Sequence, residues 1–256
     1  MPTFRLTIEY DGTDFSGWQI QPGARTVQGA LEQALATILR HPVAIQGAAR
    51  TDAGVHALGQ TASFEADTGL APDRIRKGLC ALCRPDVSVV EAAIAPDGFN
   101  ARFASIGKHY RYCVISRGAP SPLCRTQSYF VPKALDLAAM QRAAALLTGE
   151  HDFRGFRASD CGRQNTVCRL EEVSVSRAER GLVRIDVWGN AFLKYMVRII
   201  AGTLVDIGRG RLPADIIGDI LATGDRARAG TTAPPKGLTL MQVFYPEGWL
   251  RPKAAK

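Results

Sequence analysis

The segment Ala49–Gln60, with the sequence ARTDAGVHALGQ, places an arginine, a carboxylate and a glycine within a few residues of one another. A neighbouring guanidinium such as that of Arg50 favours the ionised form of Asp52. Gly54 lets the backbone turn beside a substrate with no Cβ in the way. An ionised carboxylate held in this manner can act as a nucleophile. The competing interpretation is an ordinary turn, because Asp and Gly are both favoured in turns.

A second unusual position is Arg198, which lies inside the apolar run YMVRIIAG. A buried charge is costly unless it is paired, so Arg198 is either partnered or exposed at the surface. Tyr110 lies in an alternating strand pattern, which by itself favours a position in the core. His56 follows the carboxylate closely, and we interpret it as structural. The roles of Arg198, Tyr110 and His56 depend on where the fold places their side chains.

Composition limits the class of protein. The chain has 256 residues, and its formal net charge of +8 favours a polyanionic partner such as nucleic acid. No apolar run approaches the ~20 residues needed to cross a bilayer, and the start lacks a secretory signal pattern. We therefore expect a cytoplasmic protein with no membrane partner. Of the six cysteines only Cys80 and Cys83 are closely spaced, and a zinc site would need a second pair.

The first half of the chain is expected to have the order β-α-β-β-α-β. Apolar residues alternate over 4–10, which is typical of a strand, and a helical stripe covers 27–39 behind Thr26 as N-cap. The further elements are strands at 43–49, 60–66 and 87–95 and a helix over 72–83 that begins at Pro72.

The second half repeats this order without repeating the sequence. It is expected to contain a strand at 108–116, a helix at 135–147 capped by Asp136, strands at 168–178 and 182–189, a long helix at 192–208, a shorter helix after Pro213 and a closing strand at 238–245.

Each half therefore matches the split βαβ arrangement of a ferredoxin-like fold. The expected class is α+β, with two such halves whose sheets lie side by side and leave a central cleft. The first half, residues 1–106, carries the Asp52 loop. The second, residues 107–256, carries Tyr110 and Arg198. Junctions between domains are preferred binding sites.

Five separated segments, in the same order along the chain, resemble the TruA family of tRNA pseudouridine synthases. They are IEYDGTDFSGWQ at 8–19, RTDAGVHA at 50–57, FNARFASIGKHYRY at 99–112, NAFLKYMVRIIAGTLVDIG at 190–208 and GLTLMQV at 237–243. The resemblance implies a homodimer that uses no cofactor and no metal. It also implies isomerisation of uridine to pseudouridine at positions 38, 39 and 40 in the anticodon stem-loop of tRNA.

The same resemblance implies roles for individual residues. Asp52 would be the nucleophile, and Arg198 would pair with its carboxylate. Tyr110 and Leu240 would contact the substrate, with Tyr110 packed on the target uracil. Arg50 would help to hold the target nucleotide out of its stack. The segment expected to bind RNA consists of Phe99, Asn100, Ala101, Arg102 and Phe103.

This assignment agrees with the chemistry of the reaction. An ordinary glycosidase flanks the bond that it breaks with two carboxylates, whereas an isomerase hydrolyses nothing and can use one. The target base must first leave its stack, at a cost of a few kcal/mol. An arginine and an aromatic ring near the carboxylate could hold the extruded base, since unstacked bases are recognised by stacking.

Two other classes of function are open. A non-catalytic RNA-binding protein with a ferredoxin-like sheet predicts solvent-facing aromatic side chains on that sheet, and it leaves the Arg50–Asp52 pair unexplained. A nucleoside or sugar hydrolase would use Asp52 with Asp11 or Asp14 as its second carboxylate, and it predicts released base. The fold alone does not separate these classes.

Overall fold

A computed structural model describes residues 1–249, and the chain divides into two compact units. The N-terminal unit comprises residues 1–106 together with the chain from Leu240 onward, and the C-terminal unit comprises Gly107–Thr239. The C-terminal part of the chain was expected to belong wholly to the second half. Both units combine helices with antiparallel strands, so the protein is of mixed α and β class.

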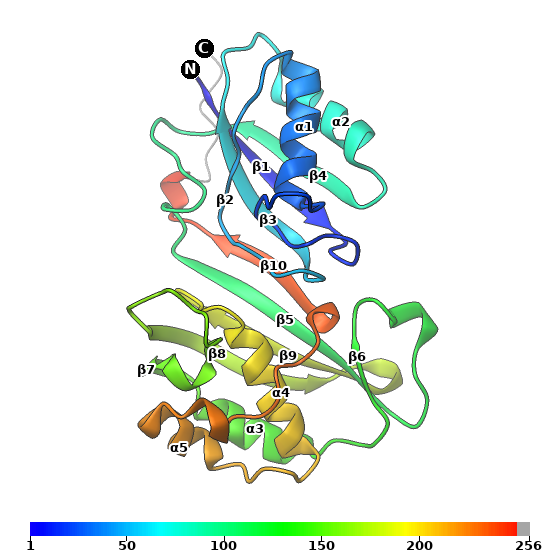
Figure 1. The fold of residues 1–256 in the computed structure, drawn as a ribbon, viewed down its shortest axis with the longest axis vertical. Coiled ribbons are helices and arrows are strands. Elements are labelled where there is room, and N and C mark those ends of the chain that lie inside the picture. The colour runs from blue at the N-terminus through cyan, green and yellow to red at the C-terminus, as the bar shows by residue number, and fades with distance from the viewer. Residues whose placement is uncertain (250–256) are drawn as a thin grey trace. The chain divides into compact units, whose positions relative to one another are not determined.

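The N-terminal unit has the element order that the sequence predicts (Figure 1). Its sheet has the strand order β4-β1-β3-β10, and β2 pairs with β3 beyond this path. The pairings of β1 with β3, β1 with β4 and β2 with β3 are antiparallel. The elements are β1 (Thr3–Tyr10), α1 (Val27–Leu39), β2 (Gln46–Gly47), β3 (His56–Glu65), α2 (Pro72–Cys83) and β4 (Val87–Ile94).

Local sequence explains why these elements form. Phe4, Leu6 and Ile8 alternate along β1 and are all at most 1% exposed, as expected for one buried face of a strand. Thr26 caps α1 by accepting a hydrogen bond from the amide of Gly29, which satisfies an otherwise unpaired donor of the first turn. Pro72 opens α2 at a position where its missing N–H costs nothing.

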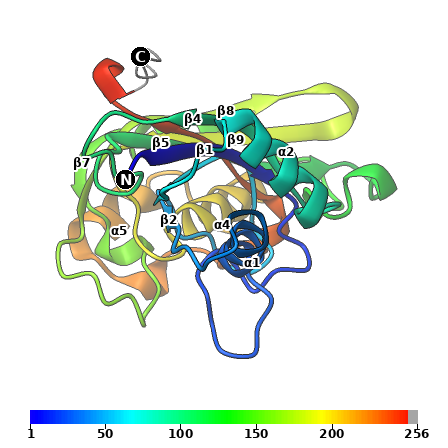
Figure 2. The ribbon, with the colours of Figure 1, turned by 90° about the horizontal axis from the view of Figure 1, so that it is seen from above.

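The strands of the C-terminal unit follow the order β5-β9-β8-β7, and β6 pairs parallel to β5. Helix α4 lies against one face of these strands (Figure 2). The elements are β5 (Gly107–Ser116), β6 (Tyr129–Val131), α3 (Leu137–Ala145), β7 (Gly149–Asp152), β8 (Val167–Arg177), β9 (Leu182–Gly189), α4 (Met196–Gly208), α5 (Ile216–Thr223) and β10 (Leu238–Phe244), whose residues from Leu240 onward belong to the N-terminal unit.

Two elements differ from the expectation for physical reasons. β2 spans two residues rather than the whole of 43–49, because side chains take the backbone groups that would extend its ladder. Glu32 accepts from the amide of Ile45, and Gln60 bonds both the amide and the carbonyl of Ala49. Helix α4 begins at Met196 rather than at residue 192, because Tyr195 has a φ of 63°, and a left-handed residue interrupts a right-handed helix.

The remaining features concern two short strands, the helices, the cysteines and possible metal ligands. The short strands β6 and β7 were not expected from the sequence. Among residues 1–249 no helix is long and apolar enough to span a membrane. The six cysteines are free thiols, and Cys83 and Cys168 are buried. Within the same residues no group of three or more His, Cys, Asp or Glu side chains is placed to hold a metal ion.

Candidate active site

The Asp52 loop joins β2 to β3 in the N-terminal unit, and its anchor is the residue just before the carboxylate. Thr51 is buried, and its hydroxyl lies 2.7 Å from the hydroxyl of Tyr10 on β1. The carbonyl of Thr51 accepts a hydrogen bond of 3.0 Å from the amide of Trp18. Asp52 itself is half-buried and Arg50 is exposed. The backbone is therefore fixed immediately beside the two side chains for which chemistry was predicted.

Residues 11–18 pack closely against this loop. The amide of Gly54 donates to the carbonyl of Phe15 at 3.3 Å. Gly17 has a φ of +93°, and a Cβ at this position would lie 2.7 Å from the carbonyl oxygen of Thr51. A Cβ on Gly12 would lie 2.0 Å from the carbonyl oxygen of Val55. Only glycine permits such close approach of two backbones, so the two glycines of the first motif shape the loop that carries Asp52.

Two buried side chains close the base of the loop. Gln60 is fully buried on β3; its amide nitrogen donates to the carbonyl of Ala49 at 2.7 Å, and its oxygen accepts from the amide of Ala49 at 3.1 Å. Trp18, 1% exposed, packs against Gly47, where a Cβ would come within 2.4 Å of the indole. Trp18 was expected to be a packing residue, whereas Gln60 was missed. Gln60 carries no distinctive signal in the sequence, because His56, Thr61 and Ser63 on the same strand are also polar and buried.

His56 has a structural role, as the sequence predicts. It is 4% exposed, and its Nδ1 accepts a hydrogen bond of 3.1 Å from the amide of Gly12. The same nitrogen lies 3.1 Å from the carboxylate of Asp11. Burial raises the pKa of Asp11, but hydrogen bonds from Thr13 and the nearby His56 outweigh it, so this pKa is lower than usual. His56 thus ties the segment after β1 to the start of β3.

The segment predicted to bind RNA divides into buried and exposed residues. Phe99 is 4% exposed and Ala101 is fully buried. The amide of Ala101 donates to Ser63 on β3 at 3.0 Å, and its carbonyl accepts from the hydroxyl of Tyr245 at 2.7 Å. Both residues anchor the segment, and Phe99 also lines the pocket described below. Their contact with RNA stays a prediction.

The exposed residues of this segment are Arg102 and Phe103. Asn100 shapes their turn, because its side-chain oxygen accepts hydrogen bonds from both of their amides, at 2.9 and 3.2 Å. The Phe103 side chain is 79% exposed, and the Arg102 guanidinium carbon lies 5.6 Å from the centre of its ring. An exposed ring beside a cation has the composition of a base-stacking platform.

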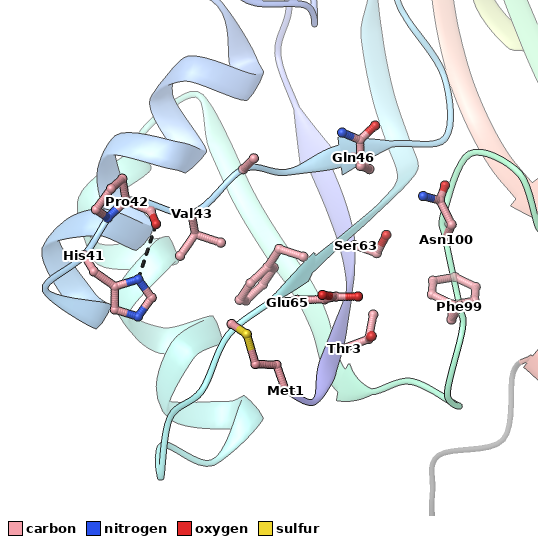
Figure 3. A pocket seen from close by; sticks show the side chains of 12 residues that line it. Met1, Thr3, His41, Pro42, Val43, Gln46, Ser63, Glu65, Phe99 and Asn100 are labelled. Carbon is pink, nitrogen blue, oxygen red and sulfur yellow. Dashed lines mark hydrogen bonds between the residues drawn. The ribbon is translucent and has the colours of Figure 1, made fainter.

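A pocket of about 400 Å³ opens behind Asn100 in the N-terminal unit (Figure 3). Its polar wall contains Asn100, Gln46 and Ser63, and the Glu65 carboxylate lies at the same wall. Asp52 and Arg50 are not among the residues that line it. A carboxylate wall repels phosphate, so the pocket suits a neutral or cationic polar group rather than the backbone of a nucleic acid.

In the C-terminal unit, Tyr110 lies on β5 opposite Val187 of β9 and is 8% exposed. Its ring meets that of Phe192 edge to face, with a distance of 5.0 Å between the ring centres. Tyr112, two residues along the same face, donates from its hydroxyl to the carbonyl of Pro234 at 2.7 Å. Burial raises the pKa of Tyr112, and the charge of Arg198 opposes this rise.

Arg198 lies in the first turn of α4 and is half-buried. Its Nε donates to the carbonyl of Ala233 at 2.9 Å, and its guanidinium carbon lies 4.6 Å from the centre of the Tyr195 ring. The alternative of a free surface arginine is therefore wrong. Asp52 belongs to the N-terminal unit and Arg198 to the C-terminal unit, so the pairing of the two is a proposal.

Leu240, the remaining residue expected to contact the substrate, is fully buried in β10. Its contact with the substrate stays a prediction.

Comparison with known proteins identifies the family. The model of a family described as tRNA pseudouridine synthase matches residues 6–104 and 143–246. This chain belongs to that family. It is 47% identical over 245 residues to a tRNA pseudouridine synthase A of Geotalea uraniireducens, covering 96% of this chain and 100% of the relative. It is 46% identical to a protein of the same name from Myxococcus xanthus, covering 97% and 94% of the two chains.

Among solved structures, this synthase is 11% identical to a chain in a structure titled "Crystal Structure of a Cbf5-Nop10-Gar1 Complex", with a TM-score of 0.33 over 92% of this chain and 57% of the other. A similarity at this level supports no argument about fold or function. The sequence relatives show the family membership, and the roles of individual residues stay predictions.

Proposed function

We propose that this tRNA pseudouridine synthase isomerises uridines 38, 39 and 40 of the anticodon stem-loop, with Asp52 as the nucleophile. One observation supports this role for Asp52 above all others. Its carboxylate is the only one in residues 48–55, and the residue before it is fixed by Tyr10 and Trp18. A reacting group held by a rigid surrounding shell is pre-organised for chemistry.

The reaction needs no water and no second carboxylate. The bond between C1′ of the ribose and N1 of uracil breaks, the base turns over, and C1′ forms a bond to C5. A proton leaves C5 and one is gained at N1, so the product has the same mass as the substrate. The Asp52 carboxylate bonds to C1′ as the bond to N1 breaks, and it leaves again when C5 of the turned base bonds to C1′. Hydrolysis would instead require a carboxylate pair around the bond.

Arg198 and Tyr110 complete the proposed site from the C-terminal unit. We infer that the two units are ferredoxin-like halves, because the N-terminal sheet places β2 and β4 at the outer positions of a β4-β1-β3-β2 order. In this arrangement Arg198 pairs with Asp52 across a cleft and keeps the carboxylate ionised. Tyr110 packs on the target uracil, and Leu240 contacts the substrate.

Binding of tRNA rests on the exposed cations and one exposed ring. Arg50 holds the space that the extruded uridine leaves, while Arg102 and Phe103 contact neighbouring nucleotides. The net charge of +8 supports a sequence-independent attraction to phosphates. We further infer a homodimer that works in the cytoplasm, in keeping with the family resemblance.

The decisive variant is Asp52→Asn, which keeps the size of the side chain and removes its charge. Pseudouridine formation in tRNA, followed with a pseudouridine-selective label and mapped by position, should fall by at least about a thousandfold, as for loss of a nucleophile. Binding of tRNA and the melting temperature should stay near those of the parent. The matched control is Asp14→Asn, an exposed carboxylate in the neighbouring segment, which should keep full activity.

Two outcomes would contradict this proposal. Turnover of Asp52→Asn within about tenfold of the parent, only ~1.4 kcal/mol of barrier, would remove Asp52 from the chemistry. Release of free uracil by the parent, with loss of that release in Asp14→Asn or Asp11→Asn, would favour the hydrolase alternative with its two carboxylates. Label at uridines outside positions 38, 39 and 40 would contradict the proposed target site.

A further inference from the structure

The orientation of Arg198 depends on a segment far away in the sequence. Ala233 contacts Arg198 twice: its carbonyl accepts from the guanidinium Nε at 2.9 Å, and its amide donates to the Arg198 carbonyl at 3.0 Å. Ala233 belongs to residues 229–234, which precede β10 and which we call the 229–234 loop. In Figure 1 this orange segment leads from the region of α5 past α4. The loop therefore sets the direction in which the guanidinium points.

Helix α4 holds the inner side of this loop. The amide of Gly230 donates to the fully buried hydroxyl of Thr203 at 2.9 Å, and the amide of Thr231 donates to the carboxylate of Asp206 at 3.3 Å. A Cβ on Gly202 would lie 1.7 Å from the carbonyl oxygen of Thr231. The backbones of helix and loop are thus in direct contact, and a displacement of the loop moves the acceptor of Arg198.

Arg226 holds the other side of the loop. Its guanidinium donates to the carbonyl of Ala229 at 3.4 Å, to the carbonyl of Gly230 at 3.0 Å and to the hydroxyl of Thr232 at 3.1 Å. The side chain is half-buried, and burial lowers its pKa. Two guanidinium nitrogens share these three acceptors, and the compact ammonium group of lysine does not reproduce this planar spread of donors.

We propose that Arg226 is a positioning residue for the reaction, acting through the 229–234 loop to aim the guanidinium of Arg198. This inference rests on the proposed role of Arg198 beside Asp52. Arg226 donates to the loop that carries the acceptor of Arg198. Substitution of Arg226 leaves the charges of Asp52 and Arg198 unchanged and alters the geometry in which they are held. In catalysis a misplacement of about 1 Å can cost about a hundredfold in rate.

The first test is Arg226→Lys, which keeps the positive charge and removes the planar fork. The single-turnover rate of pseudouridine formation should fall by about tenfold or more, while the Kd for tRNA stays within about twofold, because the number of phosphate-binding charges is unchanged. The matched control is Arg228→Lys, two residues along the same turn. Arg228 pairs with Asp219 at 3.4 Å, and its variant should retain the parent rate.

A double-mutant cycle separates positioning from a general structural role. Arg226→Lys is combined with Arg198→Lys, and the rate of each variant is measured across pH. If Arg226 acts through Arg198, its substitution should cost less than about twofold once Arg198 is already changed, because coupled residues are not additive. In the parent background Arg226→Lys should also move the acid limb of the rate profile to higher pH, since a misaligned guanidinium stabilises the Asp52 carboxylate less.

The possible results separate this inference from the proposed function. An unchanged rate in Arg226→Lys, or an equal fold loss in both backgrounds, overturns the inference. An unchanged rate in Arg198→Lys alone would instead remove Arg198 from the proposed function. If Arg226→Lys fails to fold, as judged by its melting temperature, Thr232→Val takes its place. It removes one acceptor of Arg226, and the same non-additivity with Arg198→Lys is then expected, with equal losses overturning the inference.

Discussion

Asp52 and Arg198 are held in their units by opposite means. Asp52 lies on a loop whose backbone is bonded to residues 11–18 and whose base is closed by Gln60 on the adjoining strand. Arg198 lies in the first turn of a helix, and its side chain is directed by a loop about 35 residues further along the chain. The carboxylate loop is held by glycine contacts, backbone hydrogen bonds and the side chains of Tyr10 and Gln60, and the guanidinium by a loop carbonyl whose segment is bonded by Arg226.

This difference determines which substitutions are tolerated around Asp52 and which around Arg198. A loop held by close backbone contacts is sensitive to any added Cβ at such a contact, and here also to loss of the Tyr10 and Gln60 side chains that bond it. A side-chain network is sensitive to each of its members, because a lost partner leaves a polar group unsatisfied. Substitution of the glycines should therefore disturb the N-terminal unit most, and substitution of the arginines should disturb the C-terminal unit most.

The largest effect is expected at the guanidinium itself. Arg198→Met should lower the rate of pseudouridine formation by about two to three orders of magnitude, because removing one partner of a buried pair costs about 3–5 kcal/mol. Arg198→Lys should recover only part of this loss, since an ammonium cannot reproduce a bidentate contact. Single-turnover rates with bulk tRNA measure both variants.

The pH dependence of Arg198→Met shows whether Arg198 stabilises the ionised form of Asp52. Without the guanidinium the Asp52 carboxylate is protonated more easily, so its pKa rises. Because the ionised form reacts, Arg198→Met should lose activity at a higher pH than the parent as the pH is lowered. An acid limb that stays in place, or that moves to lower pH, would show that Arg198 does not act on Asp52.

An intermediate effect is expected from a glycine pair in the N-terminal unit. Gly17 and Gly23 have φ values of +93° and +71°, but only Gly17 approaches the Asp52 loop, while nothing lies within 4 Å of a Cβ at Gly23. Alanine at either position should cost about 1–2 kcal/mol of stability, the strain of a left-handed residue. Only Gly17→Ala should also slow the reaction, by about tenfold, through displacement of the loop.

Melting temperatures and single-turnover rates of the two variants test this contrast. Equal rates for Gly17→Ala and Gly23→Ala, after similar losses of stability, would mean that the contact between residue 17 and the carbonyl of Thr51 does not position Asp52.

The smallest effects are expected in the segment that we propose binds RNA. Arg102→Ala should raise the Kd for tRNA several-fold and reduce the salt slope by about one, as for loss of one phosphate contact. Phe103→Ala should weaken binding by about 1–3 kcal/mol if a base stacks on this ring. Phe99→Leu should instead lower the melting temperature and leave the Kd unchanged. The reverse pattern, with Phe99 controlling the Kd, would contradict the division into exposed and buried residues.

Much of the fold follows from the sequence, because its signals are local. The alternation in β1, the Thr26 cap of α1, Pro72 at the start of α2 and the Asp136 cap of α3 each act within a few residues, and the structure confirms all four. The length of β2 and the start of α4 could not be predicted. They depend on Gln60 bonding Ala49 and on the left-handed conformation of Tyr195.

The candidate site shows the same limit. The motif around Asp52 is contiguous, so its loop could be recognised directly from the sequence. Burial of Phe99 and Ala101 depends on Ser63 and Tyr245, which are distant in the chain, and hydrophobicity alone gave no way to tell Phe99 from Phe103. The support of Arg198 by Ala233 and Arg226 likewise comes from a segment with no recognisable motif.

The proposed mechanism depends on one distance, that between the Asp52 carboxylate and the Arg198 guanidinium when RNA is bound. A crystal structure of the synthase with an anticodon stem-loop would measure it. We expect the two groups to be in hydrogen-bonded contact, with C1′ of an extruded uridine about 3–3.5 Å from the carboxylate, the separation of a near-attack geometry. An Arg198 side chain directed into solvent, or a target uridine placed away from Asp52, would contradict the account.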